Sequence, residues 1–179
     1  MKRAAGIGWV WLLAAAATSG WGAGAAPAGD SAKAAFARLK SLAGEWQGRV
    51  GSKDGPPVKV VYRVTAEGSA LMETLFPETP HEMVTVYHMS GDSLVLTHYC
   101  ASGNQPHMRF DPSASTPDRL VFAFDGGTSF DPAVDTHMHS AVLALKDANH
   151  LEAEWTIYQK GQQGGAHQFL LERVPAATK

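Results

Sequence analysis

The sequence has 179 residues, 45% of them hydrophobic and 18% charged, with a formal net charge of −2 at neutral pH. A chain of this length forms one domain with a substantial core, and its mild acidity argues against nucleic acid or an anionic membrane surface as a partner. Because Cys100 is the single cysteine, no internal disulfide can form, and stability has to come from packing.

The first 25 residues have the pattern of a secretory signal peptide. Lys2 and Arg3 give a positive start, an apolar stretch follows over residues 7–17, and Ala23-Gly24-Ala25 is a small-residue cleavage site. The apolar stretch is shorter than the roughly 20 residues of a spanning helix. We therefore expect a periplasmic or secreted protein with no membrane span once the signal is removed; an uncleaved anchor is the alternative.

Residues 26–30 are small and predict a linker, and the domain is expected over residues 31–175. Asp30 and Ser31 can cap a helix that runs to about Ala43. Its apolar side chains recur at three- and four-residue spacing, which places them on one face. They are Phe36, Leu39, Leu42 and Ala43.

From Trp46 onward, the apolar period changes from helical to two, which predicts strands joined by hairpin-length turns. After the strand that Trp46 begins, the expected strands are 58–65, 70–76, 82–89, 94–100, 105–110, 120–124, 136–145, 151–159 and 167–174. The segment from Gly126 to Pro132 is expected to be a long loop that acts as a lid. Gly161 to Gly165 is expected to turn the last hairpin.

The connections are too short for crossover helices, so the sheet should be antiparallel. A sheet of this many strands curls or closes. We predict an all-β protein: a single up-and-down β-barrel of about 8–10 strands with a short N-terminal helix plugging one end. A two-sheet sandwich is the alternative.

Two stretches carry a resemblance to a known family. The helix leading into Leu42-Ala43-Gly44-Glu45-Trp46 resembles the start of calycin or lipocalin-like barrels. The stretch from Met72 through His98-Tyr99-Cys100 to Gly103-Asn104-Gln105-Pro106 is similar to a family of uncharacterised bacterial lipocalin-like proteins. Related barrels bind fatty acids, retinoids or haem in the cup. The resemblance therefore implies an apolar ligand and leaves haem as a candidate cofactor, with one histidine as its axial ligand.

Polar side chains fall on otherwise apolar strand faces at two places. Residues two apart on a strand share a face, so His98 and Cys100 should lie on the inner face with Leu94 and Leu96. By the same rule His137 and His139 should share the inner face with three aliphatic residues, Ala141, Leu143 and Leu145. With Asn104 and Gln105 from the adjoining turn, these side chains are expected to be the polar contacts of a ligand cup.

The same histidines permit a metal site. Zinc takes three or four nitrogen or sulfur ligands in a tetrahedron. His137 and His139 offer two, and His98, Cys100 or His107 could complete the set. A metal-binding protein or metal-dependent enzyme that uses His98, His137 and His139 with zinc is therefore the alternative function. A nucleophilic role for Cys100 is disfavoured, because no protease signature surrounds it.

Glu73 lies between Leu71 and Leu75, so an inward face would make it a buried carboxylate that needs a partner, such as Arg63 or Arg109. It would form an internal ion pair or anchor a ligand head group. Trp155 is a further candidate for the ligand-binding set. The leading hypothesis is an exported protein that binds a small, mostly apolar molecule and is not an enzyme. The pattern leaves the oligomeric state open.

Overall fold

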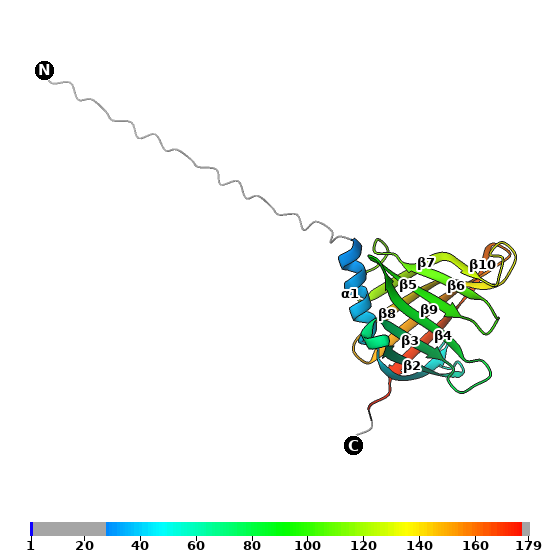
Figure 1. The fold of residues 1–179 in the computed structure, drawn as a ribbon. Coiled ribbons are helices and arrows are strands. Elements are labelled where there is room, and N and C mark those ends of the chain that lie inside the picture. The colour runs from blue at the N-terminus through cyan, green and yellow to red at the C-terminus, as the bar shows by residue number, and fades with distance from the viewer. Residues whose placement is uncertain (2–27, 177–179) are drawn as a thin grey trace.

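In the computed structural model, which describes Met1 and residues 28–176, ten antiparallel strands close into a barrel with one α-helix at its end (Figure 1). The helix is α1 (Ala28–Lys40), and a short turn, η1 (Ala66–Gly68), joins two strands. The strands are β1 (Gly44–Val50), β2 (Pro57–Thr65), β3 (Ala70–Leu75), β4 (Met83–Ser90), β5 (Ser93–Tyr99), β6 (Gln105–Phe110), β7 (Arg119–Thr128), β8 (His137–Leu145), β9 (His150–Gln159) and β10 (Gln162–Arg173).

Each strand pairs with the next along the chain, and β10 pairs with β1 to close the sheet. The predicted all-β up-and-down barrel is therefore confirmed. Alternation explains its interior: on β2, Val58, Val60 and Tyr62 are buried, whereas Lys59 and Arg63 are exposed. Gly48 lets β1 approach β10 closely, since a Cβ there would lie 1.8 Å from the Leu170 carbonyl oxygen.

The helix α1 closes one end of the barrel, which we call the closed end. Figure 1 shows it beside the barrel, next to η1. Its Phe36 and Leu39 side chains are buried in the barrel core. Three polar contacts attach it to turns of that end: Lys33 to Asp92 at 3.8 Å, Arg38 to Asp118 at 2.8 Å, and Lys40 Nζ to the Gly68 carbonyl at 3.3 Å. The plug predicted from the sequence is present.

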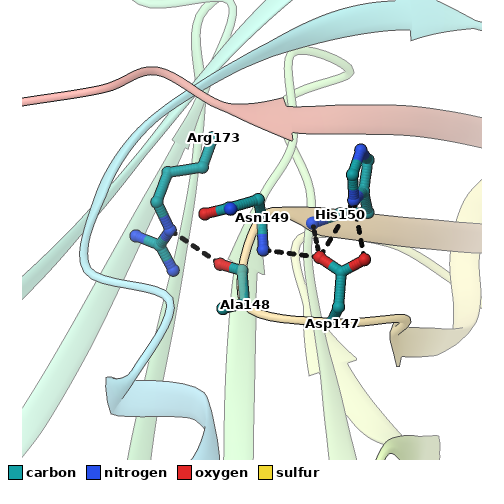
Figure 2. A network of polar contacts seen from close by, with 5 residues as sticks. All are labelled: Asp147, Ala148, Asn149, His150 and Arg173. Carbon is teal, nitrogen blue, oxygen red and sulfur yellow. Dashed lines mark hydrogen bonds and ion pairs between the residues drawn. The ribbon is translucent and has the colours of Figure 1, made fainter.

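The Arg173 side chain connects three backbone segments at the closed end, and we call these contacts the Arg173 clasp. The Arg173 guanidinium donates to the carbonyl oxygens of Ser41, Ala43 and Ala148 at 2.8–2.9 Å, and it lies 4.3 Å from the Trp46 ring centre. The end of β10 thereby joins the α1–β1 connection to the β8–β9 turn. In that turn the Asp147 carboxylate accepts bonds from neighbouring backbone and from the His150 ring (Figure 2).

Several boundaries differ from those predicted. The helix begins at Ala28, so residues 28–30 belong to it and not to a linker. Only turn-type bonds continue beyond Lys40, up to Ala43. The predicted signal peptide lies outside the described residues apart from Met1. No helix within residues 28–176 is long and apolar enough to cross a membrane.

The two predicted glycine loops are also shorter than expected. β7 continues to Thr128 because Gly127 and Thr128 pair with β6, so the lid predicted from Gly126 is partly strand. The last hairpin turns at Lys160 and Gly161, both with positive φ, of 53° and 71°. That backbone suits a two-residue hairpin. The strand resumes at Gln162 and bulges near Gly165.

Candidate functional site

An apolar cavity of about 350 Å³ lies at the end of the barrel opposite α1, and we call it the open-end cavity. Its walls come from the β1–β2, β3–β4 and β5–β6 loops and from the adjoining strand ends. Six of the lining residues are large and apolar: Val50, Leu75, Phe76, Met83, Met138 and Phe169. Its size falls within the roughly 300–1,000 Å³ typical of ligand pockets.

A larger hollow of about 970 Å³ lies on the outer face of β1, β2 and β10. Charged side chains, among them Glu45, Arg49 and Lys59, line it. Small-molecule sites are enclosed and mostly apolar, so the open-end cavity is the stronger candidate despite its smaller volume.

Three predicted site residues line the open-end cavity: His98, Cys100 and Trp155. Alternation along β5 places His98 on the inner face with Leu94 and Leu96, as predicted, and the Tyr99 side chain is half exposed. Cys100 follows the last residue of β5 and is partly buried with a free thiol. The cavity therefore extends from His98 on the barrel wall to Cys100 at the rim.

The His98 ring is held from two sides. Its Nδ1 lies 2.9 Å from the Thr85 hydroxyl oxygen, and its ring centre lies 4.8 Å from that of Trp155. Burial lowers the pKa of His98 from 6.5 to about 4, so the imidazole is neutral at physiological pH. The His98 Nε2 and the Trp155 Nε1 are both buried without a hydrogen-bond partner among the described residues.

A row of polar side chains runs inside the barrel from this histidine. Direct cross-strand pairs join Tyr62 to Glu73, Glu73 to Thr85 and Thr85 to His98. Paired residues lie about 4.5–5.5 Å apart at Cβ, so the row is continuous over four strands. Leu75, two residues beyond Glu73 on the same face, lines the open-end cavity. The polar row therefore lies next to the cavity along the barrel wall.

Glu73 is buried, as predicted. The prediction that Arg63 or Arg109 pairs with it is wrong. Arg109 pairs with Asp125, and Arg63 is exposed. The Tyr87 hydroxyl instead donates to the Glu73 carboxylate at 2.5 Å. Burial raises the pKa of Glu73 from 4.5 to about 7, although the Tyr87 bond and the nearby Tyr62 hydroxyl oppose the rise. Tyr62 itself has no partner in hydrogen-bonding geometry.

His137 and His139 do not line the open-end cavity, which corrects the predicted inner stripe. The β8–β9 register shifts between Met138 and Ser140, leaving His139 as an extra residue. A bulge breaks the alternation on which the prediction rested, and Met138 lines the cavity instead. His139 lies between two rings, 3.6 Å from Tyr158 and 4.5 Å from Phe124 between centres.

The predicted metal site is not formed. His137 Nε2 lies 3.1 Å from His139 Nδ1, but no group of three or more potential ligands comes together anywhere in the described part of the chain. His137 and His139 pack on Phe130 and Phe124, whereas His98 packs on Trp155, so the three rings lie in two different clusters. Zinc needs at least three such ligands at one point, so the zinc hypothesis is set aside.

Haem fits the open-end cavity poorly. The volume is at the lower limit of drug-sized pockets, and a haem macrocycle is larger than most such ligands. Its two propionates also need cationic partners, yet no lysine or arginine is among the described residues that line this cavity. The cavity therefore suits a smaller, uncharged molecule.

Asn104 and Gln105 connect loops and are not part of the cavity lining. The Asn104 amide donates to the Thr136 carbonyl at 2.8 Å. The Gln105 side-chain oxygen accepts from the Thr128 and Ser129 hydroxyls at 2.9 and 3.0 Å. Both tie the β5–β6 turn to the β7–β8 connection, which steadies the rim next to Cys100.

Phe76 is a lining residue that sequence reasoning missed. Its φ of 51° is rare for a bulky side chain. Its carbonyl accepts bonds from the Thr79 backbone and hydroxyl at 3.3 and 2.8 Å. Its ring centre lies 6.3 Å from that of Phe169. The Phe-Pro boundary at the end of β3 signals a turn, but nothing in the pattern turns the ring inward.

No protein-family model matches this chain, and no curated protein matches it. Among solved structures, the fold is similar to a protein of unknown function from the DUF3598 family of Nostoc punctiforme. The two are 16% identical with a TM-score of 0.40, over 76% of this chain and 48% of that one. The chain thus spans about half the length of that protein.

Proposed function

We propose that this protein binds a small, mostly apolar molecule in the open-end cavity. The observation that carries the proposal is the cavity itself: about 350 Å³ inside a closed barrel, walled by six large apolar side chains. Burying apolar ligand surface there is worth about 25 cal/mol per Å². The walls come from several strands and loops of one barrel, so much of the site exists before the ligand arrives.

Export is the second part of the proposal. It rests on the sequence of residues 1–25, with its basic start, apolar stretch and small-residue cleavage site. A periplasmic or secreted barrel with an apolar cavity at its open end suits a carrier or scavenger of a poorly soluble molecule. No catalytic group is assigned: burial lowers the pKa of His98, which makes its imidazole a weak base, and no hydrogen bond in the described part of the chain joins it to the free thiol of Cys100.

Filling the cavity tests the proposal. Met138→Trp places a larger ring in it, and Val142→Trp on the outer face of the same strand is the matched control. Delipidated protein is screened with a pool of small neutral lipophiles. A ligand at a hundred times its Kd adds about 2.7 kcal/mol of stability, which raises the Tm by several degrees.

We expect wild type and Val142→Trp to show this rise in Tm together with a change in tryptophan fluorescence. The Met138→Trp protein should keep its fold, as judged by circular dichroism, and lose the response. A wild-type protein whose Tm and fluorescence stay constant across the pool would contradict the proposal, as would equal responses in Met138→Trp and Val142→Trp.

A further inference from the structure

Two residues that line the open-end cavity each carry a buried ring nitrogen without a hydrogen-bond partner in the described part of the chain. His98 and Trp155 are each 2% exposed and both line it. Each has one buried nitrogen, Nε2 and Nε1 respectively, without a partner among the described residues. A buried polar group left unpaired costs roughly 1–3 kcal/mol, and such groups in a folded protein call for an explanation.

The chemistry of these nitrogens defines what could pair with them. The Trp155 indole N–H is a donor only. The neutral His98 imidazole uses Nδ1 toward the Thr85 hydroxyl, so its Nε2 donates or accepts according to which of the two groups supplies that proton. A carbonyl oxygen can accept from both rings, and a hydroxyl oxygen can accept from Trp155 while it donates to His98.

The remaining lining excludes a charged head group. No lysine, arginine, aspartate or glutamate is among the described residues that line the cavity. His167, exposed at the rim, is the other histidine in the lining. A carboxylate inside the cavity would lose its hydration without gaining an ion pair, which is costly. Fatty-acid anions are therefore poor candidates for this barrel.

We infer that the open-end cavity selects an uncharged molecule with one carbonyl or hydroxyl oxygen on an apolar body. That oxygen is hydrogen-bonded by the Trp155 indole and the His98 imidazole, and the body lies against the apolar walls. This inference rests on the proposed function and specifies its ligand class. The two nitrogens discriminate between ligands of equal length, whereas the walls supply most of the affinity.

A matched ligand series tests the inference on the full chain. Nonane, nonanol, heptyl methyl ketone and nonanoate share one chain length and differ in the polar end. Calorimetric titration at neutral pH should show the ketone or the alcohol binding about fivefold to tenfold tighter than nonane, the effect of one hydrogen bond of about 1 kcal/mol. Nonanoate should bind more weakly than either. The ketone and the alcohol together show which oxygen the pair of rings prefers.

Trp155→Phe removes the indole donor and keeps an aromatic ring. The advantage of the ketone or alcohol should fall to less than about threefold, while nonane affinity stays the same and reports an intact cavity. Trp46→Phe is the matched control, because it removes an indole donor at the closed end, where Nε1 bonds the Leu42 carbonyl at 2.8 Å. Its ligand preference should equal that of wild type.

The outcomes separate the two claims. Equal wild-type affinity for nonane, ketone and alcohol, or tightest binding of nonanoate, overturns the inference and leaves the proposed function standing. An oxygen preference that survives Trp155→Phe in full overturns the assignment to the indole. If no member of the series binds, both the proposed function and the inference fail. Because the wild-type series alone is decisive, poor folding of a variant does not rescue the inference.

Discussion

Each end of the barrel has a buried tryptophan, but the surroundings of the two indoles differ. At the closed end the Trp46 indole donates to the Leu42 carbonyl and lies under Arg173. At the open end the Trp155 indole is just as buried but has no partner in the described chain. Hydrogen-bonded polar groups at the closed end contribute to stability. Unpaired polar groups in the lining of a cavity call for an explanation, and a bound ligand would supply one.

The largest expected effect comes from emptying the closed end. Trp46 is fully buried, so Trp46→Ala should lower the free energy of unfolding by about 3–5 kcal/mol. The open-end cavity should keep its ligand affinity in the fraction that remains folded. Denaturant unfolding and ligand titration of the same samples check both statements. A Trp46→Ala protein that unfolds like wild type would show that the closed end does not hold the barrel together.

The polar row gives opposite pH responses at neighbouring positions. The Glu73 pKa is raised to about 7, so its contribution to stability is present below pH 4.5 and is lost as pH rises through 7. The His98 pKa is lowered to about 4, so its contribution is present above pH 6.5 and is lost as pH falls through 4. Each is worth about 3 kcal/mol, and the two oppose each other between these limits.

Glu73→Gln should expose the histidine response alone. The amide still accepts from Tyr87, and it removes the titrating carboxyl. We expect the unfolding free energy of this variant, relative to wild type, to rise by about 3 kcal/mol from pH 4.5 to pH 7. The exposed Glu172→Gln is the control. Parallel pH profiles for wild type and Glu73→Gln would mean that folding leaves the pKa of Glu73 at its ordinary value, which would contradict the predicted rise.

The Arg173 clasp should contribute somewhat less. Arg173→Met keeps much of the apolar stem but leaves the Ser41, Ala43 and Ala148 carbonyls without their charged donor, which costs about 2 kcal/mol. Arg173→Lys should recover less than half, because a point charge cannot reach three carbonyls in a fork. Chemical unfolding measures the difference, with Arg49→Lys as the control. Full recovery of the unfolding free energy in Arg173→Lys would mean that the positive charge alone, without the forked hydrogen bonds, accounts for the stabilisation.

Regular alternation explains what the sequence could predict. On β5 no residue is inserted, so the inner positions of Leu94, Leu96 and His98 follow from a period of two. On β8 the extra residue His139 shifts the pattern. Nothing in His137-Met138-His139 marks that bulge, since it depends on the pairing with β9.

The hydrogen-bond partner of a side chain on a neighbouring strand could not be predicted from the sequence either. The inward position of Glu73 is readable from its aliphatic neighbours, Leu71 and Leu75. Its bond to Tyr87 depends on β3 lying beside β4 in one register. A buried carboxylate suggests an arginine, but a tyrosine hydroxyl on the next strand satisfies it without a second buried charge. The row to His98 emerges only once the strands are aligned.

Indole N–H resonances in two-dimensional NMR compare the two ends most directly. The full chain is titrated with heptyl methyl ketone, and Trp155→Phe and Trp46→Phe identify the two signals. We predict a saturable shift of the Trp155 indole signal while the Trp46 signal stays in place. A Trp155 signal that does not move, or two signals that move together, would contradict a ligand site in the open-end cavity.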